Sequence, residues 1–299
     1  HPVVESLYEY RKSAKLLSGF LEPLPGFINS KTGRIHAHYG QIGAYSGRMS
    51  CTSPNMQQIP RDQEIRSCFI PAKGNKFIIA DYSQIELRVA AQIAGDERMI
   101  EAYKKGGDLH RLTASLITGT PIEKVTSEQR QAAKAVNFGL IFAMGARGLQ
   151  AYAGDTYGVE MSLEEAESFR ERFFNAYKGI RQWHDSIKAR PPRVSRSLTG
   201  RRYFFGEDTG IAALYNTPVQ GTAADIVKRA LGMLMDTLKG TGAGIVAVVH
   251  DEILLEVPES EAEETALLLK NTMEAAGDGF MTDVPLVAEA HLASSWAEK

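Results

Sequence analysis

Two aspartates in this 299-residue chain, Asp81 and Asp251, lie at the ends of apolar segments, where their carboxylates could take part in chemistry. Asp81 ends the apolar run 77–80, and Asp251 lies between the apolar runs 244–249 and 253–257, a pattern typical of a β-hairpin. A lone acid at the end of a strand is more often a helix cap or a turn residue. Two such acids in one sheet, however, could face each other and hold divalent metal ions about 3.5–4 Å apart, as two-metal phosphoryl transfer requires.

A second group of residues shares one helical face. A capping box at Thr126 predicts the start of a helix that continues to Gly139 or beyond. Arg130, Lys134 and Phe138 follow at intervals of four residues, so they drift only about 80° around the helix axis. An ordinary solvated basic face would leave Phe138 exposed without a reason. A nucleotide supplies one, because its phosphates attract the two cations and its flat base or sugar packs on the aromatic ring.

The elements that position these residues must combine strands and helices. Apolar periodicity predicts strands at 77–80 and in the 244–258 hairpin, and a helix over 84–94. Short strands and loops are expected over 26–75. Further helices are expected at 2–20, 96–127 (two helices), 162–188, 216–239 and 261–276, with a last strand at 285–290. The helix within 216–239 is expected to start after Pro218.

The composition is that of a globular protein. Hydrophobic residues make up 43% of the chain and charged residues 23%. No apolar run approaches the roughly 20 residues of a membrane span, and no signal peptide is evident. Cys51 and Cys68 lack metal-binding spacing and are interpreted as ordinary thiols. A first residue, His1, that is not methionine suggests a fragment or a processed product.

The net charge of −2 is unevenly distributed. Residues 256–299 hold 10 acidic and 2 basic side chains, which leaves +6 on residues 1–255. The acidic end is therefore expected to face away from a nucleic acid. Five arginines and no acids lie between Arg190 and Arg202; a solvated loop and a phosphate-contacting loop are equally good interpretations of this stretch.

Five segments resemble motifs of the family A DNA polymerases, the relatives of bacterial DNA polymerase I. DYSQIELR at 81–88 is similar to motif A, VHDE at 249–252 to motif C, and RQAAKAVNFGLIFAMG at 130–145 to the motif B helix of the fingers. SGRMSCTSPNMQQIP at 46–60 and NTPVQGTAADIVKRA at 216–230 match further family segments, and all five are in the expected order. The resemblance covers nearly the whole chain.

The resemblance implies the right-hand polymerase fold, an α/β (α+β) architecture in which an antiparallel palm sheet is combined with helical fingers. Residues 21–95 and 206–299 would form the two parts of the palm, and residues 96–205 would form the fingers. Residues 1–20 would be a residual helix at the base of a thumb that is otherwise mostly absent.

The implied reaction is template-directed addition of deoxynucleotides to a primer 3′-hydroxyl, with release of pyrophosphate. By resemblance, Asp81, Asp251 and the backbone carbonyl of Tyr82 hold two Mg²⁺ ions, for which Mn²⁺ could substitute. Arg130 and Lys134 would stabilise charge on the triphosphate, and Lys134 is a candidate proton donor to the leaving group. The catalytic set implied by the resemblance is therefore Asp81, Asp251, Lys134 and Arg130.

The resemblance also assigns a nucleotide site. Glu86 matches the family's steric gate, which would crowd a ribose 2′-hydroxyl and so distinguishes this family from the related single-subunit phage RNA polymerases. His110 matches a residue that contacts the incoming triphosphate, and Tyr82 and Phe138 would pack around the sugar and base. The full nucleotide-binding set is Gln84, Glu86, His110, Arg130, Lys134, Phe138 and Phe142.

The residues expected to contact primer–template DNA are Arg48, Asn55, Gln57, Gln220, His250 and Glu252. Arg or Gln donors in the minor groove meet acceptors that are nearly independent of sequence, so they test the shape of a base pair without reading it. The expected partners are primer–template DNA and deoxynucleoside triphosphates, without a membrane, for a monomer in the cytoplasm at the nucleoid, or in a host cytoplasm if the source is viral. The alternative function is a catalytically inactive primer–template binding module of the same fold.

Three positions depart from the family pattern. Phe142 stands where tyrosine is usual, which removes a hydroxyl near the templating base. Ala143 replaces a glycine and is expected to stiffen that turn of the helix. Ala212 occupies a position where many relatives carry arginine, which removes one polar contact. These departures bear on fidelity more than on activity.

Overall fold

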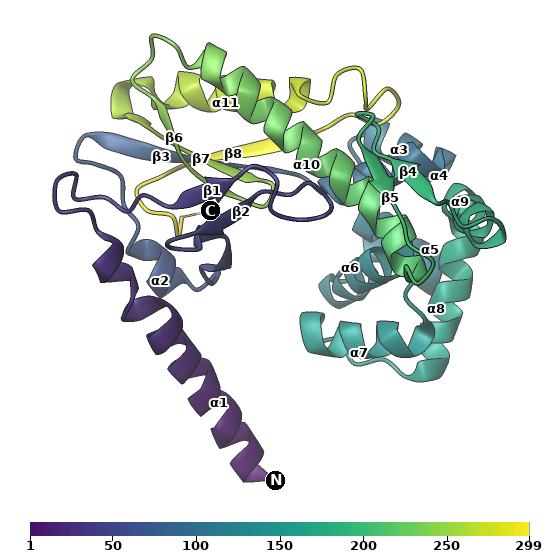
Figure 1. Ribbon diagram of the computed structural model, residues 1–299. Coiled ribbons are helices and arrows are strands. Elements are labelled where there is room, and N and C mark those ends of the chain that lie inside the picture. The colour runs from purple at the N-terminus through teal and green to yellow at the C-terminus, as the bar shows by residue number, and fades with distance from the viewer. Residues whose placement is uncertain (299) are drawn as a thin grey trace. The chain divides into compact units, whose positions relative to one another are not determined.

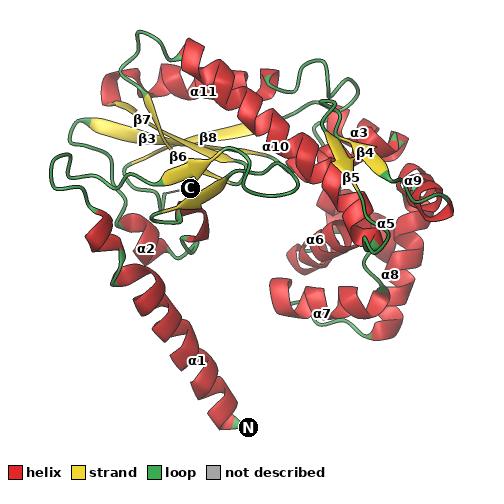
Figure 2. Ribbon diagram, viewed as in Figure 1, coloured by secondary structure: helices red, strands yellow, loops and turns green. Residues whose placement is uncertain are grey.

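The computed structural model describes residues 1–298, which divide into two compact units. Unit 1 contains His1–Ala80, Gly240–Ala266 and the residues from Ala290 onward. Unit 2 contains Asp81–Lys239 and Leu267–Glu289. Each unit therefore brings together segments that are far apart in the sequence. Figure 1 labels the helices and strands along the chain, and Figure 2 separates them by colour.

The main element of unit 1 is a four-stranded sheet with the strand order β6-β7-β3-β8. Its strands are β3 (Asn75–Tyr82), β6 (Gly244–Val249), β7 (Glu252–Pro258) and β8 (Ala288–Ala293). The last two residues of β3 and the first two of β8 belong to unit 2. β6 and β7 pair antiparallel as the predicted hairpin, with Val249 opposite Glu252. The predicted class, helices combined with an antiparallel sheet, is confirmed.

The last strand begins at Ala288, later than the predicted range 285–290. The carbonyl oxygen of Pro285 accepts a hydrogen bond from Nη1 of Arg88 at 2.7 Å. Proline also has no N–H to give to a strand ladder, so the chain at Pro285 is fixed by this side chain instead of by strand pairing.

Shorter elements complete unit 1. They are α1 (Pro2–Leu16), a π-helical turn (Leu17–Leu21), 3₁₀ turns at Leu24–Phe27, Met56–Gln58 and Glu259–Glu261, α2 (Gln63–Ser67), and the antiparallel strands β1 (His38–Gly40) and β2 (Ser50–Thr52). Most of α1 is exposed, and Figure 1 shows it extending away from the sheet. The predicted N-terminal helix is confirmed over most of its length.

The core of unit 1 packs against the sheet. Phe77 and Ile79 from β3 and Leu254 from β7 are buried together with Trp296, whose side chain is 1% exposed. Trp296 also contacts Phe69 edge to face, with the ring centroids 5.4 Å apart. Trp296 therefore ties the last residues described to the central strands of the sheet.

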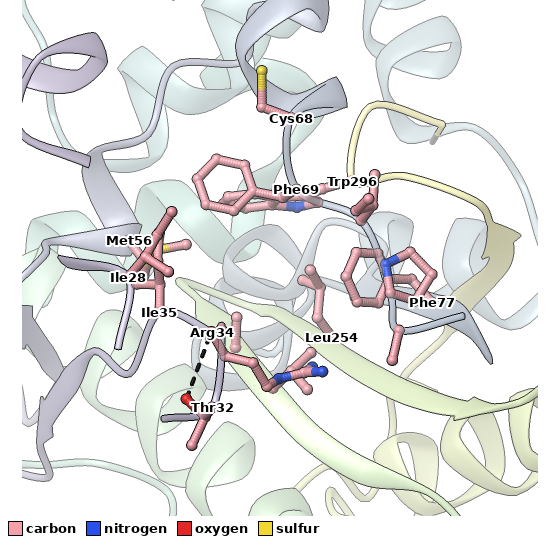
Figure 3. A pocket seen from close by; sticks show the side chains of 16 residues that line it. Ile28, Thr32, Arg34, Ile35, Met56, Cys68, Phe69, Phe77, Leu254 and Trp296 are labelled. Atoms are coloured by element: carbon pink, nitrogen blue, oxygen red, sulfur yellow. Dashed lines mark hydrogen bonds between the residues drawn. The ribbon is translucent and has the colours of Figure 1, made fainter. Parts of the chain in front are cut away.

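A cavity of about 430 Å³ opens beside this core and is lined mainly by apolar side chains, including Phe69, Phe77 and Trp296 (Figure 3). Arg34 also lines the cavity (Figure 3), and its guanidinium forms an ion pair with Glu256, which neutralises it. No residue of the predicted site lines this cavity. It is therefore separate from the candidate active site.

Unit 2 is mainly helical. Its elements are α3 (Ile85–Ala94), α4 (Glu97–Lys104), α5 (Leu109–Thr118), a 3₁₀ turn (Ile122–Lys124), α6 (Ser127–Ile141), α7 (Ala146–Tyr157), α8 (Leu163–Ala176), α9 (Lys178–Ala189), the hairpin β4 (Val194–Arg196) and β5 (Arg202–Phe204), α10 (Ile211–Thr237) and most of α11 (Ala262–Ala275). Helix α6 packs against α5, α7 and α8 (Figure 1). Among residues 1–298, no helix combines the length and the apolar character needed to cross a membrane.

Local signals define the ends of these helices. The side chains of Asp96, Asp108, Thr126 and Ser162 accept hydrogen bonds from backbone N–H groups at the first turns of α4, α5, α6 and α8. The capping box predicted at Thr126 is confirmed, because Gln129 also bonds back to the Thr126 backbone. Gly119 ends α5 with φ of 78°, a left-handed conformation that glycine adopts without strain.

The prediction that the long helix starts after Pro218 is wrong. Helix α10 begins at Ile211 and continues through Pro218 for 27 residues. Leu214, Tyr215 and Val219 are buried on either side of the proline. Burial of these side chains offsets the hydrogen bond that proline removes from the helix interior, a cost of about 3 kcal/mol.

Candidate active site

The end of β3 places the first predicted carboxylate. Asp81 is the next-to-last residue of β3 and is partly exposed. Tyr82 follows with its ring 2% exposed and its hydroxyl donating to the carbonyl oxygen of Met273 at 2.7 Å. This long-range bond orients the side chain toward Met273. The packing of the Tyr82 ring around a sugar stays a prediction.

The turn between β3 and α3 is held by residues that sequence reasoning missed. Arg88 donates through Nε to the carbonyl of Ser83 at 2.7 Å, and its guanidinium lies 4.3 Å from the ring centroid of Tyr103. The hydroxyl of Tyr103 donates to Oε1 of Gln84 at 3.1 Å. Gln84 itself has φ of 57°, a left-handed conformation. Arg88 was visible as the last residue of the DYSQIELR motif, which was the available signal.

Glu86, the predicted sugar gate, lies in the first turn of α3 and is partly exposed. Its neighbours Ile85 and Leu87 are buried, so the helix is anchored on both sides of the glutamate. This placement leaves the Glu86 carboxylate at the surface of unit 2, close in sequence to Asp81.

Helix α6 presents the predicted face. Arg130, Lys134 and Phe138 are each partly exposed, whereas seven other residues of the same helix are buried: Ala133, Ala135, Val136, Asn137, Gly139, Leu140 and Ile141. Lys134 Nζ lies 5.7 Å from the ring centroid of Tyr157, a cation–π contact. The structure therefore brings the two cations and the aromatic ring to one accessible surface.

Asp108 is an unpredicted partner of this face. Nε of Arg130 donates to Oδ2 of Asp108 at 2.7 Å, while Oδ1 of Asp108 caps α5. Burial raises the pKa of Asp108, but the hydrogen bonds from Arg130 and from the Arg111 backbone outweigh it, so the pKa lies below its ordinary value. Asp108 stays ionised and holds Arg130 in place. The Asp-Leu-His-Arg segment at 108–111 was the available sequence signal.

His110 lies next to this face, with its ring centroid 5.9 Å from that of Phe138. Burial lowers the pKa of His110 to about 4; Asp108 opposes the decrease, and Arg130 and Lys134 add to it. The imidazole is therefore neutral at neutral pH. A neutral imidazole can donate a hydrogen bond to a phosphate but adds no charge.

The end of α6 differs from the prediction. Phe142 caps the helix, and Ala143 follows with φ of 62°. The prediction that Ala143 stiffens a helical turn is wrong, because Ala143 lies beyond the helix in a left-handed conformation that alanine adopts only with strain. Phe142 is partly exposed directly before this strained residue.

We expect Ala143→Gly to stabilise the protein by about 1 kcal/mol, because glycine adopts this conformation without strain. Thermal unfolding followed by circular dichroism should show a midpoint higher by roughly 2–4 °C. Ala151→Gly is the matched control: Ala151 is exposed in the middle of α7, where glycine should cost about 1 kcal/mol. A lower midpoint for Ala143→Gly would contradict the strain argument.

Gln220, the remaining predicted site residue of unit 2, lies in α10 and is partly exposed. Its neighbours Val219 and Gly221 are buried. A β-carbon on Gly221 would lie 1.8 Å from the hydroxyl oxygen of Tyr203, so only glycine allows the helix to pack this closely. That packing fixes the part of α10 from which Gln220 projects.

In unit 1, the hairpin between β6 and β7 carries the second predicted carboxylate. His250 and Asp251 form its two-residue loop, and His250 has φ of 61°. Asp251 is partly exposed. Burial lowers the pKa of His250 first, and the positive charge of Arg48 lowers it further. Arg48 and His250, two predicted DNA contacts, are thus electrostatic neighbours.

Glu252 is buried within unit 1. Nε1 of Trp296 donates to Oε1 of Glu252 at 2.9 Å, and Nη1 of Arg66 lies 4.0 Å from the same oxygen. The guanidinium of Arg66 also stacks 4.3 Å from the Trp296 ring centroid. This placement favours a structural role for Glu252, which supports the hairpin carrying Asp251, over the predicted DNA contact.

The other predicted DNA contacts of unit 1 lie in short turns. Oδ1 of Asn55 accepts from the backbone N–H of Gln57 at 3.1 Å and so caps the 3₁₀ turn Met56–Gln58. Asn55, Gln57 and Arg48 are all partly exposed. Their roles as DNA contacts stay predictions.

Three of the four non-glycine residues with positive φ in residues 1–298 lie in segments that carry predicted site residues. They are Gln84, Ala143 and His250, with φ of 57°, 62° and 61°. Such conformations cost of order 1–3 kcal/mol and concentrate at active sites and ligand-binding segments. The backbone therefore marks the same three segments that the sequence motifs mark.

The donor atoms suit magnesium. Within residues 1–298, no group of three or more His, Cys, Asp or Glu side chains is arranged to hold a metal ion. Mg²⁺ in phosphoryl-transfer sites, however, takes only one or two protein carboxylates and completes its octahedron with substrate phosphates and waters. Asp81 and Asp251 are partly exposed, and the strands β3 and β7 that adjoin them are neighbours in the sheet.

Comparisons with known proteins agree with these observations. The sequence pattern of the family described as DNA polymerase family A matches residues 1–298. DNA polymerase I of Aquifex aeolicus (strain VF5) is 44% identical over 255 residues, which is 83% of this chain and 44% of that protein. The thermostable DNA polymerase I of Thermus filiformis is 38% identical over 313 residues, 100% of this chain and 36% of that protein.

A solved structure gives the same result. The chain is similar to the POL domain of Pol1 from M. smegmatis in complex with DNA primer-template and dNTP, with a TM-score of 0.89 and 34% sequence identity. The similarity covers 100% of this chain and 54% of that one, and the chain spans less than half the length of the two curated relatives. The chain belongs to DNA polymerase family A.

Proposed function

We propose that this chain is the catalytic portion of a template-directed DNA polymerase. The observation that carries the proposal is the surface of α6, where Arg130, Lys134 and Phe138 are accessible side by side and the neutral His110 adjoins them. Two cations suit a triphosphate, and an aromatic ring suits a sugar or base. The related M. smegmatis domain, solved with DNA primer-template and dNTP, supports the same ligands.

The proposed metal ligands are the carboxylates of Asp81 and Asp251 and the backbone carbonyl of Tyr82, with Mg²⁺ as the ion and Mn²⁺ as a substitute. When bound, two such ions lower the pKa of a primer 3′-hydroxyl and neutralise the departing pyrophosphate. The protein's own contribution is to hold two carboxylates at the ends of neighbouring strands. Arg88 and Tyr103 keep the β3–α3 turn in shape around Asp81.

The cations of α6 would act on the triphosphate. Arg130 donates to Asp108 through Nε, so its remaining N–H groups can bind phosphate while Asp108 keeps the guanidinium oriented. Lys134 would stabilise charge on the leaving group and donate a proton to it. Gln84 and Phe142 complete the proposed nucleotide site.

The DNA would be held mainly by unit 1 and by α10. Arg48, Asn55, Gln57 and His250 would contact the primer–template duplex from unit 1, and Gln220 from α10. We further propose a monomer that works in the cytoplasm. The subdivision into palm (21–95 and 206–299), fingers (96–205) and thumb-base helix (1–20) belongs to the same proposal.

Primer extension tests the proposal directly. We expect the chain to extend a labelled primer on a DNA template when Mg²⁺ and deoxynucleotides are present, and not after chelation of the metal. Binding of primer–template without any extension, at several Mg²⁺ and Mn²⁺ concentrations, would instead support the inactive binding module.

Glu86→Ala should admit ribonucleotides, because the shortened side chain leaves space for a 2′-hydroxyl. We expect the ratio of kcat/KM for deoxy- over ribonucleotide to fall by roughly tenfold or more. Glu101→Ala is the matched control, since Glu101 is 66% exposed on α4 and forms an ion pair with Lys105. An unchanged ratio in Glu86→Ala would place sugar selection at another residue.

A further inference from the structure

Four polar side chains buried in unit 2 form a continuous hydrogen-bonded chain that ends at His110. Nδ2 of Asn137 lies 2.9 Å from Nδ1 of His110, and Oδ1 of Asn137 accepts from Oγ1 of Thr113 at 2.9 Å. Oγ1 of Thr113 lies 2.7 Å from the hydroxyl of Tyr177. Asn137, Thr113 and Tyr177 are 0% exposed and His110 is 2% exposed. A buried hydrogen-bonded chain of this kind favours one arrangement of its members.

The donors and acceptors of this hydrogen-bonded chain match when every bond is donated in the direction from Tyr177 to His110. Tyr177 donates to Thr113, Thr113 donates to Asn137, and the Asn137 amide N–H donates to Nδ1 of His110. If the Asn137 amide were flipped, its N–H would donate to Thr113 instead. The hydroxyl hydrogen of either Thr113 or Tyr177 would then have no acceptor among the contacts that the described residues make. A buried donor without an acceptor disfavours that arrangement by roughly five- to a hundredfold.

This direction determines the tautomer of His110. A neutral imidazole carries one hydrogen, and Nδ1 is the acceptor, so the hydrogen must be on Nε2. Within residues 1–298, Nε2 of His110 has no hydrogen-bond partner, and this atom is not fully enclosed by the protein. Nε2–H is thus an accessible donor at the ring that lies beside Phe138.

We propose that Asn137, oriented by Thr113, is a positioning residue that holds His110 in the Nε2–H tautomer and so makes it a hydrogen-bond donor to the triphosphate. The triphosphate contact rests on the proposed function; the tautomer does not. The charged groups near the His110 ring are Asp108 from the start of α5 and Arg130 and Lys134 from α6, and the same three remain in every variant tested.

The first test reads the tautomer without nucleotide. Nitrogen-15 NMR of histidine-labelled protein should show His110 as a neutral Nε2–H ring at pH 7. His184 is an internal reference, because its Nε2 lies 2.9 Å from the carbonyl oxygen of Ile141 and must carry a hydrogen. Thr113→Val should give a mixture of tautomers, since Asn137 loses the group that orients it, and Thr113→Ser should restore the single form. Tyr177→Phe should keep the Nε2–H form, because the step from Thr113 to Asn137 remains.

The second test uses Asn137→Asp, which keeps the shape of the side chain. A carboxylate at this position accepts from Nδ1–H, so His110 can donate through Nε2 only when it is doubly protonated. The ratio of mutant to wild-type KM for the deoxynucleotide should therefore be near one at pH 6 and rise by roughly tenfold at pH 9. A role in packing alone would change KM or kcat equally at all pH values.

The outcomes distinguish the positioning of His110 by Asn137 from the contact of His110 with the triphosphate. An Nδ1–H tautomer in the wild type, or a single unchanged tautomer in Thr113→Val, overturns the positioning role whatever the activity. An Nε2–H tautomer together with a wild-type KM in His110→Ala overturns the triphosphate contact and leaves the hydrogen-bonded chain intact. The Nε2–H tautomer with a pH-dependent KM ratio in Asn137→Asp supports the whole proposal.

Discussion

Asp81→Asn and Asp251→Asn are each expected to reduce primer extension by roughly a thousandfold while leaving primer–template binding nearly unchanged. Asparagine keeps the shape of aspartate but removes the negative charge that a divalent cation requires. Neither residue is a proposed duplex contact, so DNA affinity should not depend on the charge. The two measurements are extension of a labelled primer at fixed Mg²⁺ and fluorescence anisotropy of the same duplex.

Asp236→Asn is the matched control, since its carboxylate is 78% exposed on α10 and pairs with Lys239. We expect its extension rate to lie within about twofold of the wild type, as for most exposed substitutions. Near-normal extension by Asp81→Asn or Asp251→Asn would show that the carboxylate concerned is not a metal ligand. Loss of duplex binding in either variant would point to misfolding of the segment instead.

Features that depend on local pattern were predicted from the sequence. The capping box at Thr126 specifies the start of α6 with its own side chains, and the four-residue spacing then determines that Arg130, Lys134 and Phe138 share a face. The hairpin of β6 and β7 follows from two apolar runs and a two-residue loop. In each case the sequence signal lies within the element that it predicts or in the residues next to it.

Features that depend on partners distant in sequence were not predicted. Tyr82 bonds to Met273, and Glu252 to Trp296, and no local pattern connects either pair. Glu252 was expected to contact DNA, but it is buried and accepts a hydrogen bond from Trp296. The ion pair of Arg130 with Asp108 is a similar case, since it joins the starts of two helices.

Pro218 and Ala143 show the same limit in the backbone. A proline in the middle of a helical pattern normally indicates a helix end, but burial around Pro218 outweighs that preference in α10. Ala143 fits a helix by its own propensity, yet the chain leaves α6 there in a left-handed conformation. Both results follow from tertiary packing, which outweighs propensities of a few kcal/mol or less.

Phe138 gives the most specific test of the proposed nucleotide site. Phe138 is partly exposed on α6, one turn after the cation Lys134, and its ring centroid lies 5.9 Å from that of the neutral His110. In the family, relatives with tyrosine here accept dideoxynucleotides readily, whereas those with phenylalanine discriminate against them. A tyrosine hydroxyl can replace a polar contact that the missing 3′-hydroxyl would have made near the triphosphate.

We therefore expect the wild-type chain to reject dideoxynucleotides and Phe138→Tyr to relax that rejection by roughly ten- to a hundredfold, the range of a hydrogen bond to a charged group. Competitive incorporation of dideoxy- against deoxynucleotide measures the ratio in both proteins. Phe204→Tyr adds the same hydroxyl to a ring that is 67% exposed on β5 and should leave the ratio unchanged. Equal ratios in wild type and Phe138→Tyr would mean that Phe138 does not face the sugar, and the whole accessible surface of α6 would then need another ligand.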